Sequence, residues 1–179
     1  DESYIVVISE LADCDTLRWF KHQRTHEEYK SVILQMIYTI YTFHNVVKYI
    51  HDDLHLGNFL VHKIKPGGFF TYTINNVEIK VPNCGYLIVI WDFGGSREFN
   101  EDDFAYDYFI PLDKIIDIRA FIDIDPLFDL KPLPDSTIEW LKNIIDYMMR
   151  SFLPNNPQYD FKTEHETISS LPVSSNSDI

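Results

Sequence analysis

An amphipathic helix of about five turns is the feature that most limits how this chain can fold. Thr25 and Glu28 have the spacing of a capping box, which predicts that a helix begins there. After them, apolar residues recur with the 3.6-residue period of one helical face: Tyr29, Val32, Ile33, Met36, Ile37, Ile40 and Phe43. The pattern ends near His44 and Asn45. A helix this long with one apolar face predicts a core packed against that face.

Composition sets the class of protein and excludes several functions. The 179 residues suffice for one domain with a real core, and 45% apolar and 15% aromatic residues are typical of a globular chain. A formal net charge of -13 disfavours binding to a nucleic-acid backbone or to an anionic membrane. No apolar run reaches the roughly 20 residues of a membrane helix. Cys14 and Cys84 match no metal-site pattern and are expected to be free thiols in a reducing, intracellular compartment.

Short strands and helices alternate along the chain and predict an α+β fold. Strands are expected at 4–8, 59–64, 69–74, 77–81 and 86–91, with the third and fourth forming a hairpin around Asn75 and Asn76. Asp15 should cap a short helix. Two later helices are expected at 112–124 and from Ser136, which forms a second capping box with Glu139, to about 152. The helices before and after the strands should sandwich a small, mainly antiparallel sheet.

Two polar runs stand between segments that look like core. In "HDDLHLGN", residues 51–58, Leu54 can anchor the loop in the core while a carboxylate accepts a hydroxyl proton and an amide oxygen binds a hard cation. In "IVIWDFGGS", residues 88–96, Asp92 ends an apolar strand and precedes a glycine, which suits a metal ligand. Asn58 and Asp92 together would leave room for substrate phosphates, as Mg²⁺ sites usually do.

These two runs resemble the catalytic loop and the metal-binding loop of the protein kinase superfamily, which read His-Arg-Asp-Leu-x-x-x-Asn and Asp-Phe-Gly. The resemblance implies that Asp53 is the catalytic base and that Asn58 and Asp92 bind Mg²⁺. His51 would pack the loop. His55 stands where many protein kinases have a lysine that touches the transferred phosphate, so it is the second candidate catalytic residue.

The flanking segments fit the same resemblance. The predicted strand at 4–8 resembles the strand that leads into the nucleotide hinge, which makes Glu10, Leu11 and Ala12 the hinge residues whose backbone would bind adenine. Asp15, or alternatively Asp13, would bind the ribose. In the helix predicted at 112–124, Asp117 resembles the buried aspartate that braces the catalytic loop. The implied cofactors are ATP and Mg²⁺.

Two departures concern the parts that bind ATP and regulate the loop. The sequence has no glycine-rich loop and no Ala-x-Lys strand, so residues 1–155 are expected to form only a kinase-like C-terminal lobe, with the N-terminal lobe supplied elsewhere and residues 156–179 forming a flexible tail. Alone, this lobe should bind ATP weakly and transfer little phosphate. Asp52 replaces the arginine that normally pairs with a phosphate on the activation segment, which predicts no activation by phosphorylation there.

Two further departures concern the loops after the catalytic residues. There are 33 residues between Asn58 and Asp92, about twice the usual gap, and the excess is expected to be an inserted hairpin at about 67–86. Its Phe70 and Tyr72 face would either dock a partner or pack on the parent lobe. Only 22 residues separate Gly94 from Asp117, with no Ala-Pro-Glu motif, so the platform that positions a peptide substrate should be short or absent.

Three functions remain open at this point. The first is a serine/threonine protein kinase-like phosphotransferase, similar to kinases of large DNA viruses, that moves the ATP γ-phosphate to a hydroxyl on a protein or small-molecule acceptor. The second is a small-molecule kinase, because "DLHLGN" also resembles the His-Gly-Asp-Leu-His-x-x-Asn loop of aminoglycoside and choline phosphotransferases. The third is a non-catalytic pseudokinase scaffold. The expected location is intracellular: the cytoplasm, including that of a host cell, or a virion.

Overall fold

The computed structural model describes residues 10–74, 77–99, 107–108, 111–112, 115 and 133–152, with side chains described only to Ile144 in the last range. Along these residues, the helices and strands that the structure delimits are, in chain order, β1 (Cys14–Asp15), α1 (Thr16–Trp19), α2 (His26–Thr42), the π-helix η1 (Phe43–Val47), β2 (Tyr49–Ile50), the 3₁₀ turn η2 (Leu56–Asn58), β3 (Phe59–Lys63), β4 (Phe69–Ile74), β5 (Val77–Pro82), β6 (Tyr86–Ile90), the 3₁₀ turn η3 (Phe93–Gly95), β7 (Arg97–Glu98) and α5 (Asp135–Phe152). The α+β class predicted from the sequence is confirmed.

Helix α2 forms as the sequence predicts. The Thr25 hydroxyl accepts a hydrogen bond from the Glu28 amide at 3.2 Å, and the Glu28 carboxylate accepts one from the Thr25 amide at 2.8 Å. Such a cap contributes roughly 0.5–2 kcal/mol to helix stability. The predicted apolar face is inaccessible to solvent at Tyr29, Val32, Ile33, Met36 and Ile40. The core of the molecule is therefore built along this helix.

A buried amide joins α2 to the sheet behind it. Gln35 is fully buried, and its side chain donates to the Tyr86 carbonyl at 3.0 Å and accepts from the Ile88 amide at 3.1 Å. Both ends of the side chain are thus satisfied by the backbone of β6. Because a buried amide without partners is costly, this pair of bonds sets how β6 lies along the helix.

The strands form three small antiparallel sheets. One has the order β1-β3-β6, the second pairs β2 with β7, and the third is the β4-β5 hairpin. In the first sheet, Phe59 lies opposite Ile90 and Lys63 lies opposite Tyr86. This register places the residue before β3, which is Asn58, next to the residue after β6, which is Trp91. The two polar runs of the sequence therefore meet at one end of the sheet.

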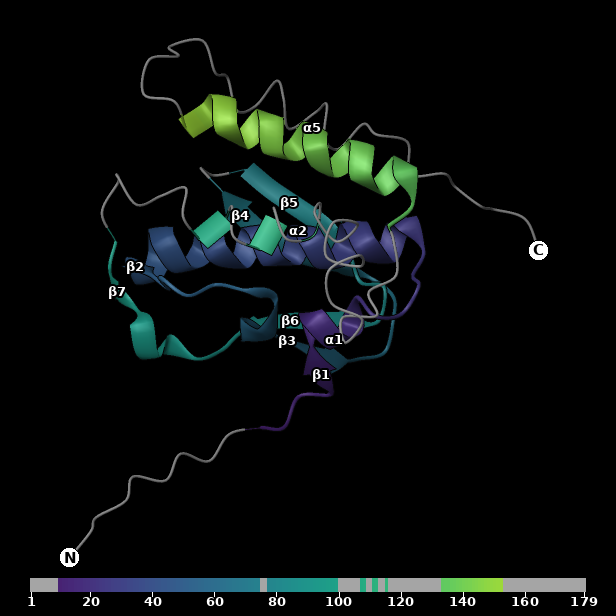
Figure 1. Ribbon diagram of the computed structural model, residues 1–179, viewed down its shortest axis with the longest axis horizontal. Helices are drawn as coiled ribbons and strands as arrows, with labels where there is room; N and C mark the ends of the chain where they lie inside the picture. The colour runs from purple at the N-terminus through teal and green to yellow at the C-terminus, as the bar shows by residue number, and fades with distance from the viewer. Residues whose placement is uncertain are drawn as a thin grey trace, which may run out of the picture.

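Helix α2 lies at the centre of the arrangement (Figure 1). The β1-β3-β6 sheet lies on one side of it, and the hairpin and α5 lie on the other. Helix α5 packs directly on α2, where His26 Nδ1 lies 2.7 Å from the Thr137 hydroxyl and Lys30 lies over the Trp140 ring. The expected sandwich of strands between two helical layers is therefore wrong in detail, because the long amphipathic helix is the inner layer.

The β4-β5 hairpin packs on the rest of the molecule. The Tyr72 and Tyr38 rings lie with centroids 5.1 Å apart, and Val81 and Ile79 of β5 are buried. Phe70 also packs against the core. Of the two alternatives for the face that carries Phe70 and Tyr72, packing on the parent lobe is the one observed.

The structure describes only some of the other elements that the sequence predicts. Asp15 caps α1 as expected, with its carboxylate accepting from the Arg18 amide at 2.6 Å. Helix α5 begins at Asp135, so Ser136 lies inside the helix and the second capping box is wrong. The strand at 4–8, most of 112–124, the hairpin tip at Asn75 and Asn76, and the tail at 156–179 lie outside the described residues. Within the described ranges, no helix combines the length and the apolar character needed to cross a bilayer.

Candidate active site

The loop at 51–58 is anchored by its apolar and aromatic positions. His51 and Leu54 are fully buried, as the sequence analysis expected of Leu54, whereas Asp53 and His55 are exposed. The loop closes on itself through bonds from the His55 amide to the Asp53 carbonyl at 3.1 Å and from the Asn58 amide to the His55 carbonyl at 2.9 Å. The alternation of buried and exposed positions leaves the Asp53 carboxylate at the surface of a fixed backbone.

Asp107 braces this loop from a distant part of the chain. Its carboxylate accepts hydrogen bonds from the His51 amide at 2.7 Å and from the Asp52 amide at 3.0 Å. His44 Nε2 lies 2.8 Å from the same carboxylate, and the side chains of His44 and Asp107 are both fully buried. Charge-assisted bonds of this kind are among the stronger ones in a protein interior. Asp107 therefore fixes the backbone immediately before Asp53.

The brace is a functional residue that the sequence analysis missed. The residue predicted for this role, Asp117, lies outside the described ranges. Asp107 makes the bonds expected of such an aspartate. One feature of the sequence could have identified Asp107. It is flanked by Tyr106 and Tyr108, whereas the acidic residues at 101–103 adjoin one another.

Asn58 connects the two polar runs. Its side-chain Nδ2 donates to the Asp53 carbonyl at 2.8 Å, and its own carbonyl accepts from the Trp91 amide at 2.9 Å. Asn58 as a whole residue is 7% exposed. The bond to Asp53 is made by Nδ2. The other polar atom of the side chain, Oδ1, could bind a cation and takes no part in that bond.

Asp92 has an uncommon backbone conformation. Its φ is 62° and its ψ is 67°, in the left-handed region, where aspartate is one of the few residues besides glycine that occur with any frequency. Among the described residues, the non-glycine residues with positive φ are Lys48, Asp52 and Asp92. Two of these belong to the candidate site, and such strained residues cluster at functional sites in proteins generally.

The segment that follows Asp92 lies against the loop at 51–58. A β-carbon built on Gly95 would lie 3.4 Å from the His51 carbonyl oxygen and 3.9 Å from the Asp53 β-carbon. His51 Nε2 donates to the Trp91 carbonyl at 2.8 Å, and the Phe93 ring packs on the His51 ring with centroids 5.6 Å apart. The structure thus brings the segments carrying Asp53, Asn58 and Asp92 together.

The predicted hinge residues lie at the edge of the same sheet. Glu10 and Leu11 are exposed, Leu11 at 92%, and Ala12 is half-buried. The chain then enters β1, where Asp15 lies opposite Leu60. The Thr16 hydroxyl donates to the Leu56 carbonyl at 2.6 Å, which joins this segment to the end of the candidate catalytic loop.

The carboxylates considered for ribose binding already have partners. Asp15 caps α1, and the Asp13 carboxylate accepts from the Lys63 amide at 2.7 Å. Burial raises the pKa of the neighbouring Cys14 thiol, and the Asp15 carboxylate adds to that rise. Cys14 and Cys84 are both free thiols, as expected.

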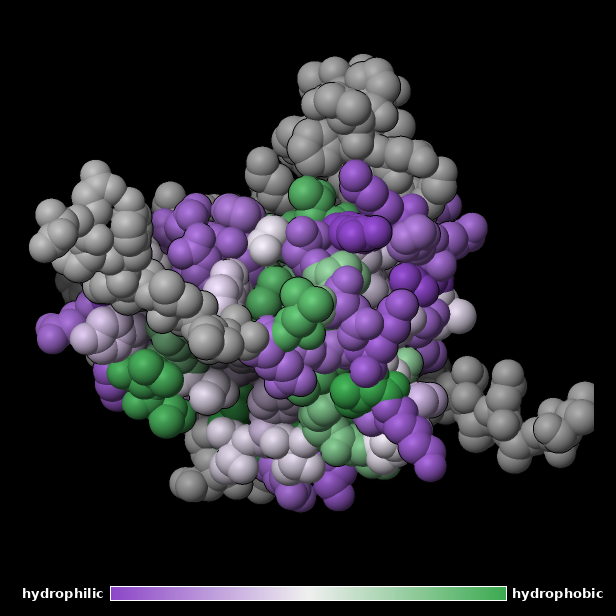
Figure 2. Space-filling model, turned by 90° about the horizontal axis from the view of Figure 1, so that it is seen from below, coloured by the Kyte–Doolittle hydropathy of each residue, from purple (hydrophilic) through white to green (hydrophobic). Residues whose placement is uncertain are grey.

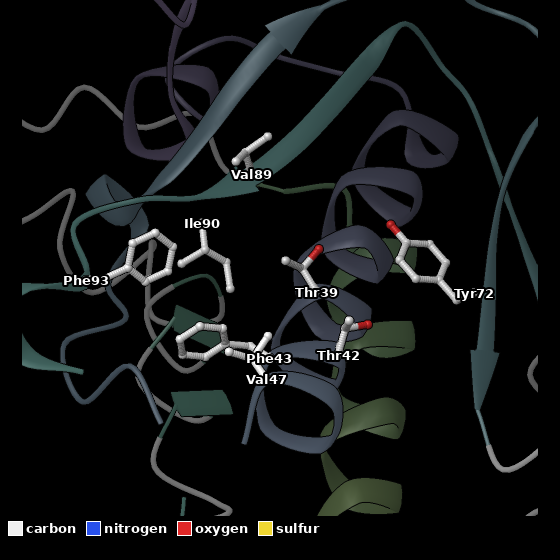
Figure 3. Close-up of a pocket in the computed structure, with 8 residues that line it drawn as sticks. All are labelled: Thr39, Thr42, Phe43, Val47, Tyr72, Val89, Ile90 and Phe93. Atoms are coloured by element: carbon white, nitrogen blue, oxygen red, sulfur yellow. The ribbon is translucent and has the colours of Figure 1, made fainter. Parts of the chain in front are cut away.

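An apolar groove adjoins the polar site. A cavity of about 340 Å³ is lined by residues of α2, the adjoining π-helix, the hairpin, β6 and the 3₁₀ turn after Asp92: Thr39, Thr42, Phe43, Val47, Tyr72, Val89, Ile90 and Phe93. Figure 3 shows the rings of Phe93 and Phe43 near Ile90, with Tyr72 beyond the two threonines. Seen from the lower side of Figure 1, the surface carries separate hydrophobic patches among hydrophilic residues (Figure 2).

The donor atoms fit a cation that also binds phosphate. In the part of the chain that the structure describes, no group of three or more His, Cys, Asp or Glu side chains could hold a metal ion by itself. Asn58 and Asp92 instead offer an amide oxygen and a carboxylate, the hard oxygen donors that Mg²⁺ takes while substrate phosphates fill other positions. The chemistry of these two donors is therefore suited to Mg²⁺.

Comparisons with known proteins give two partial likenesses, both to viral proteins. An uncharacterized protein of Invertebrate iridescent virus 3, 011L, is 32% identical over 79 residues, which are 44% of this chain and 10% of that protein. A protein of Frog virus 3 (isolate Goorha), named "Putative serine/threonine-protein kinase 019R", is 29% identical over 69 residues, 37% of this chain and 8% of that protein. No profile of a known protein family matches the chain.

These likenesses are limited in extent. Each covers less than half of this chain, and the chain spans only about a tenth of the length of these two curated relatives. They support a kinase-like relation at most, through the second protein.

Proposed function

We propose that this chain carries the catalytic lobe of a serine/threonine protein kinase-like phosphotransferase, which moves the γ-phosphoryl group of ATP to a hydroxyl. The observation that carries the proposal is the position of Asn58. Its side chain is bonded to the backbone of Asp53, and its carbonyl is bonded to the amide next to Asp92. Two hydrogen bonds thereby join Asn58 to Asp53 and to Trp91, the residue before Asp92.

In the proposed reaction, Asp53 acts as the general base. Its exposed carboxylate accepts the proton of the acceptor hydroxyl as the oxygen–phosphorus bond forms and the bond from the γ-phosphorus to the ADP oxygen breaks. The backbone of the loop does not have to move in this step, because Asp107 holds the two preceding amides. Positioning of this kind is a large part of catalysis in phosphoryl transfer.

Asn58 Oδ1 and the Asp92 carboxylate would hold Mg²⁺, which supplies positive charge to the phosphate oxygens when it is bound. His55 is proposed to face the transferred phosphate. Its Nδ1 accepts from the Gly57 amide at 3.0 Å, which restrains the ring and leaves Nε2 as the nitrogen that can donate to a phosphate. Glu10, Leu11 and Ala12 are proposed to bind adenine and Asp15 the ribose, with Asp13 as the alternative.

An N-terminal lobe supplied elsewhere is part of the proposal. Leu11, Val89, Trp91 and Phe93 are large apolar residues that remain 38–92% exposed beside the candidate site. Apolar surface of this kind is typical of a docking face. We propose that the lobe covers this face and completes the ATP site.

An Asp53→Asn variant of the complete gene product tests the proposal. We expect phosphate transfer from Mg·ATP to fall by at least about 100-fold, the usual contribution of a general base, while thermal stability is unchanged because the side chain is exposed. Glu78→Gln, which removes an exposed carboxylate on the hairpin, is the matched control. Full activity of Asp53→Asn would exclude the assigned role.

An acceptor screen separates the open alternatives. Peptides with serine and threonine should accept phosphate if the chain is protein kinase-like. Amino alcohols or aminoglycosides should accept it if the chain is instead a small-molecule kinase. A thermal shift with Mg·ATP and no transfer to any acceptor would favour the pseudokinase scaffold.

A further inference from the structure

An ion pair joins the two loops of the candidate site on their outer side. Arg97 Nε donates to the Asp52 carboxylate at 3.0 Å. The Asp52 backbone is fixed in turn, because its amide donates to Asp107 at 3.0 Å and its φ is 67°. Arg97 begins β7, where it lies opposite Ile50 of β2. The pair therefore bridges the residue before Asp53 and a residue shortly after Asp92.

We propose that this ion pair positions the segment that carries Asp92, so that Arg97 and Asp52 are positioning residues for phosphoryl transfer. The inference rests on the proposed function for its activity readout. In the kinase resemblance, position 52 is an arginine that binds a phosphate on the segment after the metal ligand. Here the charges are reversed: the carboxylate at 52 takes the place of the phosphate, and the arginine at 97 supplies the cation.

The reversal has a regulatory consequence. A carboxylate in the chain is present at all times, whereas a phosphate has to be added and can be removed. The segment after Asp92 is thus held without modification. A phosphate added near Asp52 would face a like charge there, and it would also compete for Arg97.

The ion pair adds a side-chain contact to a segment that is otherwise held by backbone bonds and by the packing of the Phe93 ring. Before Asp92, these are the bonds of Trp91 to His51 and Asn58. After it, they include the packing of the Phe93 ring on Phe43 and His51, the turn from Phe93 to Ser96, the short β2-β7 pairing and the bond from the Phe99 amide to the Lys48 carbonyl at 2.9 Å. The two side chains of the pair remain 47% and 36% exposed, so the pair adds little to global stability. Its effect should therefore appear in local order and in catalysis rather than in unfolding.

A double-mutant cycle on the complete gene product tests the proposal. The variants are Asp52→Asn, Arg97→Gln and the two combined; asparagine tolerates the left-handed backbone of position 52, so only the charge is lost. Amide hydrogen exchange in the peptide covering 93–99 should rise about fivefold in each single variant and no further in the double variant. Additive effects in the double variant, or unchanged exchange in the single variants, would overturn the proposal.

Activity provides the second readout. Each single variant should raise the Mg²⁺ concentration needed for half-maximal transfer, and the double variant should match the single ones. An unchanged Mg²⁺ requirement in an active enzyme would count against the positioning role. If the unmodified protein transfers no phosphate, the proposed function fails, whereas the exchange measurements still decide whether the pair orders the segment.

An anion-rescue experiment tests the reversed charges directly. Asp52→Arg places two guanidinium groups together, so hydrogen exchange in 93–99 should rise, and sulfate should lower it again relative to chloride at equal ionic strength. Asp52→Asn is the matched control and should show no such sulfate effect. Equal responses of the two variants to sulfate would overturn the assignment of Asp52 as the replacement for a phosphate.

Discussion

The loop at 51–58 and the segment at 91–97 meet at the candidate site, but different interactions hold them. The first is fixed from inside the protein, because the buried Asp107 carboxylate binds its backbone and Leu54 lies in the core. The second is exposed over most of its length and is held by backbone bonds, by contacts of the Phe93 ring with His51 and Phe43, and by one surface ion pair.

The loop at 51–58 and the segment at 91–97 therefore control different properties of the protein. Breaking a buried, charged network lowers the free energy of unfolding of the whole protein. A surface segment with few contacts can shift without unfolding, so its loss changes the site alone. The proposed base is thus built into the fold, whereas the proposed metal ligand Asp92 is placed by weaker interactions. The following predictions test that division.

Asp107→Asn should have the largest effect. The substitution replaces one acceptor oxygen with an NH₂ group, which then faces a backbone N–H in a fully buried setting. We expect the free energy of unfolding to fall by about 3–5 kcal/mol, the usual cost of breaking a buried charged network. Urea denaturation of the purified chain measures it, with Glu78→Gln as the control. A loss below about 1 kcal/mol would mean that the loop is not braced from inside.

His51→Phe tests the link between the two regions. The phenyl ring keeps the packing against Phe93 but removes the donor to the Trp91 carbonyl. We expect a loss of about 1–3 kcal/mol in the free energy of unfolding, because a partly buried carbonyl loses its partner. Hydrogen exchange should rise in 91–97 and stay unchanged in 51–58. Equal increases in both peptides would show that the regions open together, contrary to the comparison.

Gly95→Val should leave stability almost unchanged and affect the site. A β-carbon at Gly95 is within ordinary contact distance of the His51 carbonyl oxygen, at 3.4 Å, so Gly95→Ala is expected to be tolerated and serves as the control. The two extra methyl groups of valine have to displace the segment. We expect transfer activity to fall about tenfold or more, since small misplacements are costly in catalysis. Equal activities of the two variants would indicate that this close approach has no role.

The sequence predicted those parts of the fold that local patterns determine. The capping box at Thr25, the apolar face of α2 and the β4-β5 hairpin each depend on residues within a few positions of one another. Helix α5 begins earlier than the Ser136–Glu139 spacing predicted, because its first backbone bonds already run from the Thr137 and Ile138 amides to the Pro134 carbonyl.

The candidate site was predictable where motifs are contiguous, and not where they depend on tertiary contacts. Asp53, Asn58 and Asp92 were found from two short runs. The brace by Asp107 acts on residues 55 and 56 positions away, and nothing local distinguishes a bracing carboxylate from its acidic neighbours except the aromatic residues beside it. The Asp52–Arg97 pair depends on strands of two residues each, which are too short to give a periodic signal.

The smallest predicted effect lies away from both loops, at the contact of α2 with α5. Burial lowers the pKa of His26, and nearby Lys30 lowers it further, while Glu27 acts in the opposite direction. The folded chain therefore binds fewer protons than the unfolded chain below about pH 6.5, so stability should decline as the pH falls from there through the lowered pKa. His26→Gln keeps a polar partner for Thr137 and should remove this part of the pH dependence. Urea midpoints of both proteins at pH 5–7.5 measure it.

Because this contact supports α2 and not the loops, hydrogen exchange in 51–58 and 91–97 should not differ between the two proteins at pH 7.5. A difference there would show that the loops also depend on the packing of α5.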